Sequence, residues 1–187
     1  MGGVHGDEPE GVQLATDLLH WLQKNNNLNL KPWILIPCLN VDGYSKAQRT
    51  NSNGVDLNRN FQTPDWSPES KAPRYYPGPY PNSEKETQAL TNLIETEKPS
   101  LIVHFHSWEP CIVYTGQPGS VAAKTLAEDT PYEYKEDIGY PTPGSLGQYG
   151  WLSQRTPVIC IEAQEKSDLN TLWPIFGPGL QKILRLE

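Results

Sequence analysis

Three short apolar runs in this chain each lead to a side chain that can bind a metal ion or carry a proton. The three side chains are His5, His106 and Glu162. Short apolar runs of this kind are typical of buried strands. In a mostly parallel sheet the carboxyl ends of the strands lie along one edge, so residues far apart in the sequence can meet there. The pattern therefore predicts an α/β fold, with a mixed, mostly parallel central sheet flanked by helices.

The first of these side chains lies in a turn that leads into a helix. Pro9 suits the first position of a helix, and apolar residues follow it at helical spacing, at positions 12, 15, 18, 19 and 22. The turn holds His5 and Glu8 so that an imidazole and a carboxylate point the same way. Zinc accepts such a pair, and a hydrolytic zinc site needs one more protein ligand and an open position for water. The alternative is a capped helix start with a solvated histidine.

The run from Leu101 to Ser107 is expected to form a central strand that carries two histidines. His104 and His106 share one face of this strand, because side chains two residues apart point the same way. They stand about 7 Å apart along the strand, so we expect one ion to be held by only one of them. His106 lies at the carboxyl end and is the expected ligand, with His104 expected either to support that ligand or to be a buried, hydrogen-bonded residue. The alternative is that both are core histidines bonded to the backbone.

A polar loop is expected from Asn40 to Asn60. It contains Arg49 and, further on, the adjacent pair Asn58 and Arg59. A guanidinium beside an amide can bind a carboxylate, because arginine donates two parallel hydrogen bonds to its two oxygens. The alternative is a loop stabilised by Asx turns, with an arginine at the surface.

The remaining segments complete the expected layers. Trp33–Leu39 has the apolar pattern of a buried strand. Ser83 and Glu86 have the spacing of a capping box at the start of a helix. The segment 62–82, rich in proline and aromatic residues, is expected to pack on the domain and to rim a cleft. Further expected elements are helices at 118–129, 146–153 and 169–186, the last interrupted near Gly177-Pro178, and a stiff loop at 139–145 that presents Tyr140 at a cleft.

Composition narrows the class of protein. A chain of 187 residues with 36% hydrophobic residues, six Trp and nine Tyr fits one folded domain, here residues 1–187. The formal charge of −7 speaks against binding to nucleic acid or to anionic membranes. We found no apolar stretch long enough to span a bilayer and no export signal, and three widely spaced cysteines suit free thiols. We therefore expect a cytoplasmic protein.

The candidate motifs occur in an order found in a known family. They are His5-Gly6-Asp7-Glu8, the runs 54–61 and 82–87, His106-Ser107, and Glu162 after an apolar strand. As an ordered set they resemble the zinc carboxypeptidase superfamily, of the carboxypeptidase A type. Within it, the segment 139–145 resembles bacterial murein peptide amidases. Only three residues precede Val4, so we expect the fold to lack N-terminal strands of the family.

The resemblance implies a metal centre with one Zn²⁺ per chain. His5, Glu8 and His106 are similar to the family's zinc ligands. Glu162 resembles its general base, and Arg49 matches the arginine that stabilises the oxyanion.

The resemblance also implies a binding site for the substrate. Asn58 and Arg59 match the pair that grips the terminal carboxylate of the substrate. Tyr140 matches the family's mobile tyrosine.

These roles predict a zinc metallocarboxypeptidase or amidase that hydrolyses an amide bond near the free carboxylate of a small peptide. The likeness to murein peptide amidases implies the γ-D-glutamyl–diaminopimelate bond of murein peptides. Two alternatives stay open. Aspartoacylase and succinylglutamate desuccinylase share a zinc His/Glu turn and an Asp-Leu-Asn-Arg run, so the chain could be an N-acyl amino-acid deacylase. It could also be an inactive module that only binds carboxylates.

Overall fold

A four-stranded mixed sheet forms the centre of the computed structural model, which describes residues 1–186. The strand order is β1-β4-β2-β3, with β1 at Ile102–Trp108, β4 at Val158–Gln164, β2 at Cys111–Thr115 and β3 at Tyr134–Lys135. β1 pairs with β4 in parallel and β2 with β3 in parallel, whereas β2 and β4 are antiparallel. The predicted mixed, mostly parallel α/β architecture is confirmed.

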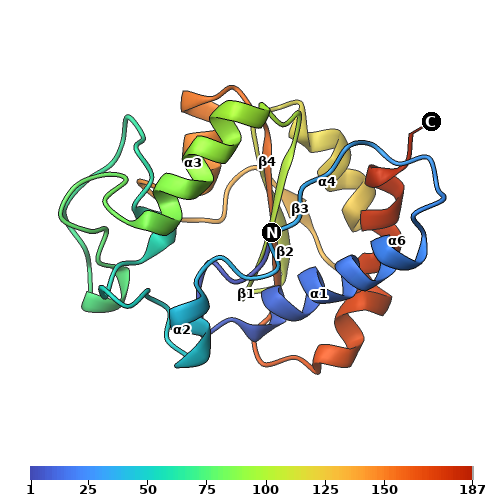
Figure 1. Cartoon of the computed structure of the whole chain (residues 1–187), viewed down its shortest axis with the longest axis horizontal. Coiled ribbons are helices and arrows are strands. Elements are labelled where there is room, and N and C mark those ends of the chain that lie inside the picture. Colours follow the sequence, from blue (N-terminus) through green and yellow to red (C-terminus); the bar gives the residue numbers. More distant parts are fainter. Residues whose placement is uncertain (187) are drawn as a thin grey trace.

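Helices cover both faces of the sheet. Figure 1 shows α1 (Pro9–Lys24), α4 (Gly119–Ala127) and α6 (Leu172–Leu184) on one side and α3 (Lys85–Glu97) on the other. The shorter elements are α2 (Val41–Ser45), α5 (Leu146–Gln148), a π-helical turn at Tyr149–Ser153, and 3₁₀ turns at Leu57–Arg59, Pro73–Tyr75 and Leu169–Thr171. No helix within residues 1–186 combines the length and apolar composition needed to cross a membrane.

The first residues of the chain run beside β1. The Met1 amino group donates to the Val103 carbonyl at 2.8 Å, and the Phe105 amide donates to the Met1 carbonyl at 2.9 Å. On the other side of this segment, the Gly2 amide donates to the Ile36 carbonyl at 3.0 Å. These bonds place the turn that follows Val4 at the carboxyl end of β1.

The segment Trp33–Leu39 differs from its prediction. It runs alongside residues 2–3 but does not form a regular strand, and Trp33 and Ile34 are 45% and 57% exposed. Pro32 and Pro37 supply no amide hydrogen, which limits the ladder that this segment can form. The prediction of a buried strand at Trp33–Leu39 was therefore wrong.

The start of α3 also differs, because the predicted capping box does not form. α3 begins after Glu84, and no side chain of the expected pair caps it. Instead, Asn60 reaches across from the preceding loop, and its Oδ1 accepts from the Glu84 amide at 3.1 Å and from the Thr87 hydroxyl at 2.7 Å. A fully buried amide thus ties the loop that contains Asn58 and Arg59 to the helix.

The terminal helix is continuous where the sequence predicted an interruption. α6 runs through Gly177 and Pro178 to Leu184. Phe176 and Leu180, on either side of this pair, are both buried in the core between the sheet and α1, α4 and α6. Packing of this apolar face outweighs the helix-breaking tendency of the proline.

Substituting Phe176 with alanine is expected to lower the free energy of unfolding by about 3–5 kcal/mol, because it removes a fully buried ring from this core. The ring packs edge-on against Tyr132 with centroids 5.0 Å apart, so a cavity would remain. Urea unfolding of the two proteins measures the difference. Val121→Ala is the matched control, since Val121 lies on α4 and is 72% exposed. An equal effect of both substitutions would contradict the assigned core.

Candidate metal centre

The turn between Val4 and α1 places His5 and Glu8 at the carboxyl edge of the sheet. Gly6 allows this turn, because a Cβ there would lie 2.0 Å from the Gly43 carbonyl carbon. His106 on β1 stands in register with Glu162 on the parallel strand β4. β1, β4 and the turn before α1 therefore bring four of the predicted side chains to one place, although residues 1–4, expected as the end of a strand, form no regular strand.

The donor atoms of His5, Glu8 and His106 converge on one point. Nδ1 of His5 lies 2.6 Å from Glu8 Oε1, and Nδ1 of His106 lies 2.7 Å from Glu8 Oε2 and 3.0 Å from Nδ1 of His5. All three residues are buried. Two imidazoles and a carboxylate are a donor set that zinc favours, and three protein ligands leave one position open. The residues present therefore fit a zinc ion.

Asp56 supports His5 from behind. Its Oδ1 lies 3.1 Å from Nε2 of His5, and its Oδ2 accepts from Nε of Arg49 at 2.9 Å. Burial alone would raise the pKa of Asp56, but His5 and Arg49 hold that pKa well below its usual range. Asp56 was not predicted from the sequence as a site residue, although it lies within the run 54–61, two positions before Asn58.

The two carboxylates of the centre have opposite pKa shifts. Burial would raise the pKa of Glu8, but the adjacent His5 and His106 hold it well below the ordinary value. Burial raises the pKa of Glu162, and the histidine His106 offsets this only in part. An ionised Glu8 suits a metal ligand, while a Glu162 with a raised pKa suits a group that accepts a proton.

The strand face beneath the centre is polar. Nε2 of His106 lies 2.9 Å from Nδ1 of His104, which is buried, so the expectation of a buried, hydrogen-bonded neighbour is confirmed. Burial lowers the pKa of His104 well below its ordinary value. The Cys160 thiol donates to Glu162 Oε1 at 3.2 Å. Cys38, Cys111 and Cys160 are all free, as predicted.

A cleft of about 600 Å³ opens above the centre. It is lined by all of the predicted site residues, namely His5, Glu8, Arg49, Asn58, Arg59, His106, Tyr140 and Glu162. Part of the segment 62–82 also lines it, so the prediction that this segment rims a cleft is confirmed. The structure thus brings the whole predicted set to one hollow.

Arg49 is held at one wall of this cleft. Its Nη1 donates to Glu8 Oε1 at 3.3 Å, and its guanidinium carbon lies 5.2 Å from the centre of the Tyr75 ring. This cation–π contact helps to hold the guanidinium at the wall of the cleft. Tyr75 was not singled out in the sequence, since only its membership of an aromatic-rich loop marked it.

Asn58 and Arg59 lie in a 3₁₀ turn on the same cleft. The side-chain oxygen of Asn58 accepts from the Leu146 amide at 2.9 Å, and Arg59 Nη1 donates to the Asn58 carbonyl at 2.7 Å. These bonds orient the Asn58 amide nitrogen and the remaining nitrogens of Arg59 as donors. Two adjacent donor groups of this kind can bind a carboxylate.

Tyr140 lies at the rim. Its ring packs edge-on against Trp108 with centroids 5.4 Å apart, and it remains 38% exposed. Burial raises the pKa of Tyr140 above its ordinary value, which favours the protonated phenol. The residue can therefore donate a hydrogen bond into the cleft.

The chain is similar to several known proteins over most of its length. The family model of zinc carboxypeptidases (Peptidase_M14) matches residues 1–153. Murein peptide amidase A of Escherichia coli (strain K12) is 33% identical over 160 residues, which cover 80% of this chain and 64% of that protein. The chain thus spans less than two thirds of the length of this relative.

Solved structures extend the likeness beyond residue 153. The crystal structure of murein-tripeptide amidase MpaA from Escherichia coli O157 superposes with a TM-score of 0.74 and 26% identity, covering 99% of this chain and 80% of that one. Bovine thrombin-activatable fibrinolysis inhibitor, in complex with tick carboxypeptidase inhibitor, gives a TM-score of 0.77 at 19% identity, over 97% of this chain and 79% of that one. The second match shows a shared fold.

Proposed function

The chain belongs to the zinc carboxypeptidase family, and from this premise we propose that it is a zinc-dependent amidohydrolase acting near the free carboxylate of a small peptide. The observation that carries the proposal is the convergence of His5, Glu8 and His106 on one point of the cleft that Glu162 also lines. Bound there, zinc would lower the pKa of a water molecule to about 7 and polarise the amide carbonyl.

The protein's own residues would supply the proton transfer. Glu162 takes a proton from the attacking water and passes it to the leaving amine, acting first as base and then as acid. The raised pKa of Glu162 favours this role, because a group that accepts and returns a proton works best near the operating pH. Arg49, anchored through Asp56, donates to the oxyanion that forms.

The other cleft residues would orient the substrate. Asn58 and Arg59 hold its free carboxylate, which selects a bond near that end. Tyr140 donates a hydrogen bond to the substrate from the rim of the cleft.

Murein peptides are the proposed substrates, with the γ-D-glutamyl–diaminopimelate bond as the bond cleaved. Two of the relatives named above act on murein peptides according to their names, and this likeness supports the proposed substrate. Action in the cytoplasm, without nucleic acid or membrane, stays a prediction from sequence.

Zinc analysis and a murein digest test this proposal together. The purified protein is expected to bind one zinc ion and to release diaminopimelate from murein tripeptide, as followed by liquid chromatography and mass spectrometry. Chelation should abolish turnover, and added Zn²⁺ should restore it. Absence of zinc binding would end the proposal. Turnover of N-succinylglutamate in place of the tripeptide would favour the deacylase, and peptide binding without turnover would favour a binding module.

A further inference from the structure

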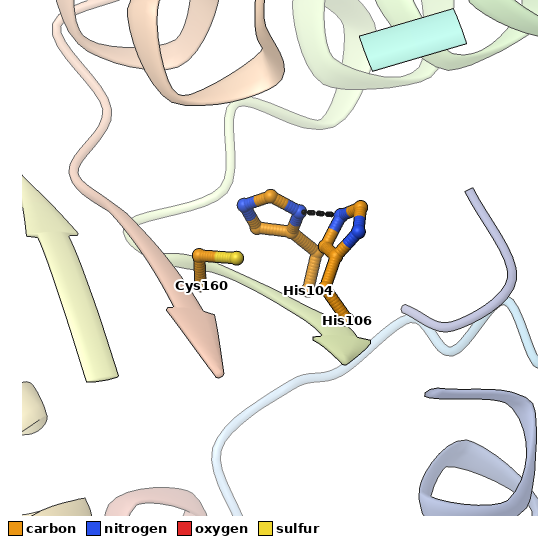
Figure 2. Close-up of side chains that lie close together, drawn as sticks. All are labelled: His104, His106 and Cys160. Carbon is orange, nitrogen blue, oxygen red and sulfur yellow. Dashed lines mark hydrogen bonds between the residues drawn. The ribbon is translucent and has the colours of Figure 1, made fainter. Parts of the chain in front are cut away.

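A second group of side chains, two of them buried and one half-buried, lies next to the candidate metal centre. Figure 2 shows His104 and His106 on β1 and Cys160 on the neighbouring strand β4. His104 stands in register with Cys160, so the three side chains share one face of the sheet. The rings of His104 and His106 meet edge-on at 89°, with centroids 4.8 Å apart and Nδ1 of His104 facing Nε2 of His106.

The two nitrogens of His106 face different partners. Nδ1 lies among the donor atoms of His5 and Glu8, while Nε2 lies 2.9 Å from His104. A neutral imidazole that binds an ion through one nitrogen carries its hydrogen on the other. His106 can therefore offer Nδ1 to an ion only if Nε2 carries the hydrogen and donates it to Nδ1 of His104. That bond would fix the tautomers of both rings.

We propose that His104 is a positioning residue of the zinc centre, which accepts the Nε2 hydrogen of His106 and so holds Nδ1 of His106 toward the ion. The inference rests on the proposed function, because it requires zinc at the centre. Partners of this kind fix the ring orientation of histidine ligands and typically change metal affinity about 10–100-fold when removed.

The two histidine ligands would then be supported differently. His5 faces the carboxylate of Asp56, whereas His106 faces an imidazole. Glu8, Asp56 and Glu162 already place three buried carboxyl groups around the centre. An uncharged acceptor beside His106 orients the ring without adding a fourth buried carboxylate to the centre. A further carboxylate without a partner would be costly to bury.

The same three side chains could be taken for a second ion site, since donor atoms of His104, His106 and Cys160 lie within 4.8 Å of one another. The hydrogen bonds argue against this. The facing nitrogens of the two histidines are bonded to each other, and the thiol donates to Glu162. An ion would have to break both bonds and share His106 with zinc. We therefore assign the group as support for one ion.

Zinc affinity of His104 variants tests the inference. Zinc-free protein is titrated against a coloured chelator for the parent, His104→Leu and His104→Asn. We expect His104→Leu to weaken zinc binding about 10–100-fold. His104→Asn should bind nearly as tightly as the parent, because its amide oxygen can take the place of Nδ1. Cys160→Ala is the matched control from the same group, with no bond to His106, and should leave zinc affinity unchanged.

A cobalt titration adds a spectroscopic result. The parent should take up one equivalent of Co²⁺ without thiolate-to-cobalt charge-transfer absorption, and His104→Leu should alter the ligand-field bands. A second equivalent with a thiolate band that Cys160→Ser removes would overturn the inference. So would parent-like zinc affinity in folded His104→Leu.

Two further outcomes have distinct meanings. If His104→Leu does not fold, zinc affinity is compared between His104→Asn and His104→Gln. The asparagine oxygen can take the position of Nδ1, whereas the glutamine amide reaches past it, so His104→Gln should bind zinc more weakly. Equal zinc affinity of those two variants would also overturn the inference. A parent protein that binds no zinc would contradict the proposed function itself and not the role of His104 alone.

Discussion

Replacing Glu162 with glutamine is expected to lower kcat by about 10²–10⁴ while one zinc ion stays bound, because the amide cannot accept a proton from water. Glu162 is separate from the three converging donors, so its loss leaves the zinc site intact. Its Oε1 accepts a hydrogen bond from Cys160, which the glutamine oxygen can also accept, so the fold should tolerate the change. Steady-state kinetics on murein tripeptide and zinc analysis measure the two quantities.

Glu165→Gln is the matched control. Glu165 also lines the cleft but lies beyond the end of β4, outside the donor cluster. Its substitution should leave kcat near the parent value. If Glu162→Gln turned over substrate as fast as the parent, Glu162 would not be the base. If Glu165→Gln lost activity instead, the base would have been assigned to the wrong carboxylate.

The convergence of His106 and Glu162 could be predicted from the sequence because strand ends follow a general rule. The apolar runs before His106 and Glu162 indicated strands of a mostly parallel sheet, and the carboxyl ends of such strands share an edge. The His5 turn was recognisable because Pro9 and the helical apolar pattern fixed the start of α1. These signals are local, so a single sequence contains them.

The partners of these residues could not be predicted in the same way. Asp56 and Tyr75 reach the centre through loops without periodicity, and the path of those loops is set by long-range bonds such as that of Asn60 to the start of α3. Nothing in the sequence near Ser83 indicates that a distant asparagine will replace the capping box. His104 was placed on the correct strand face, but its bonding partner depended on the rotamers of both rings.

Tertiary packing also overrode two local signals. A proline inside a helix usually breaks or kinks it, so Pro178 predicts an interruption. The helix α6 nevertheless continues, because Phe176 and Leu180 are both buried. Ile34 lies in an apolar run typical of a buried strand, yet it is more than half exposed. Burial depends on which elements cover a segment, and that information lies outside the segment itself.

Substituting Arg49 with methionine is expected to lower kcat by about 10²–10³ with little change in KM, because it removes one donor to the oxyanion. Nε and Nη1 of Arg49 are bonded to Asp56 and Glu8, and the guanidinium packs on Tyr75. Within residues 1–186 no hydrogen bond is made by Nη2, so this atom is the donor proposed for the cleft that Arg49 lines. A donor held in place before the charge forms costs no reorganisation during the reaction, which is why its loss should reduce kcat.

Arg59→Met supplies the contrasting control, since both arginines line the same cleft but serve different stages of the reaction. Arg59 is proposed to bind the free carboxylate in the ground state as well as in the transition state, so its loss should raise KM more than it lowers kcat. Arg49→Met also leaves buried Asp56 without its cation, so zinc content and thermal unfolding must be measured in parallel. Arg49→Lys keeps the charge and should lie between the parent and Arg49→Met in kcat. A rise in KM for Arg49→Met at unchanged kcat would reverse the two assignments, because it would place Arg49 in substrate binding.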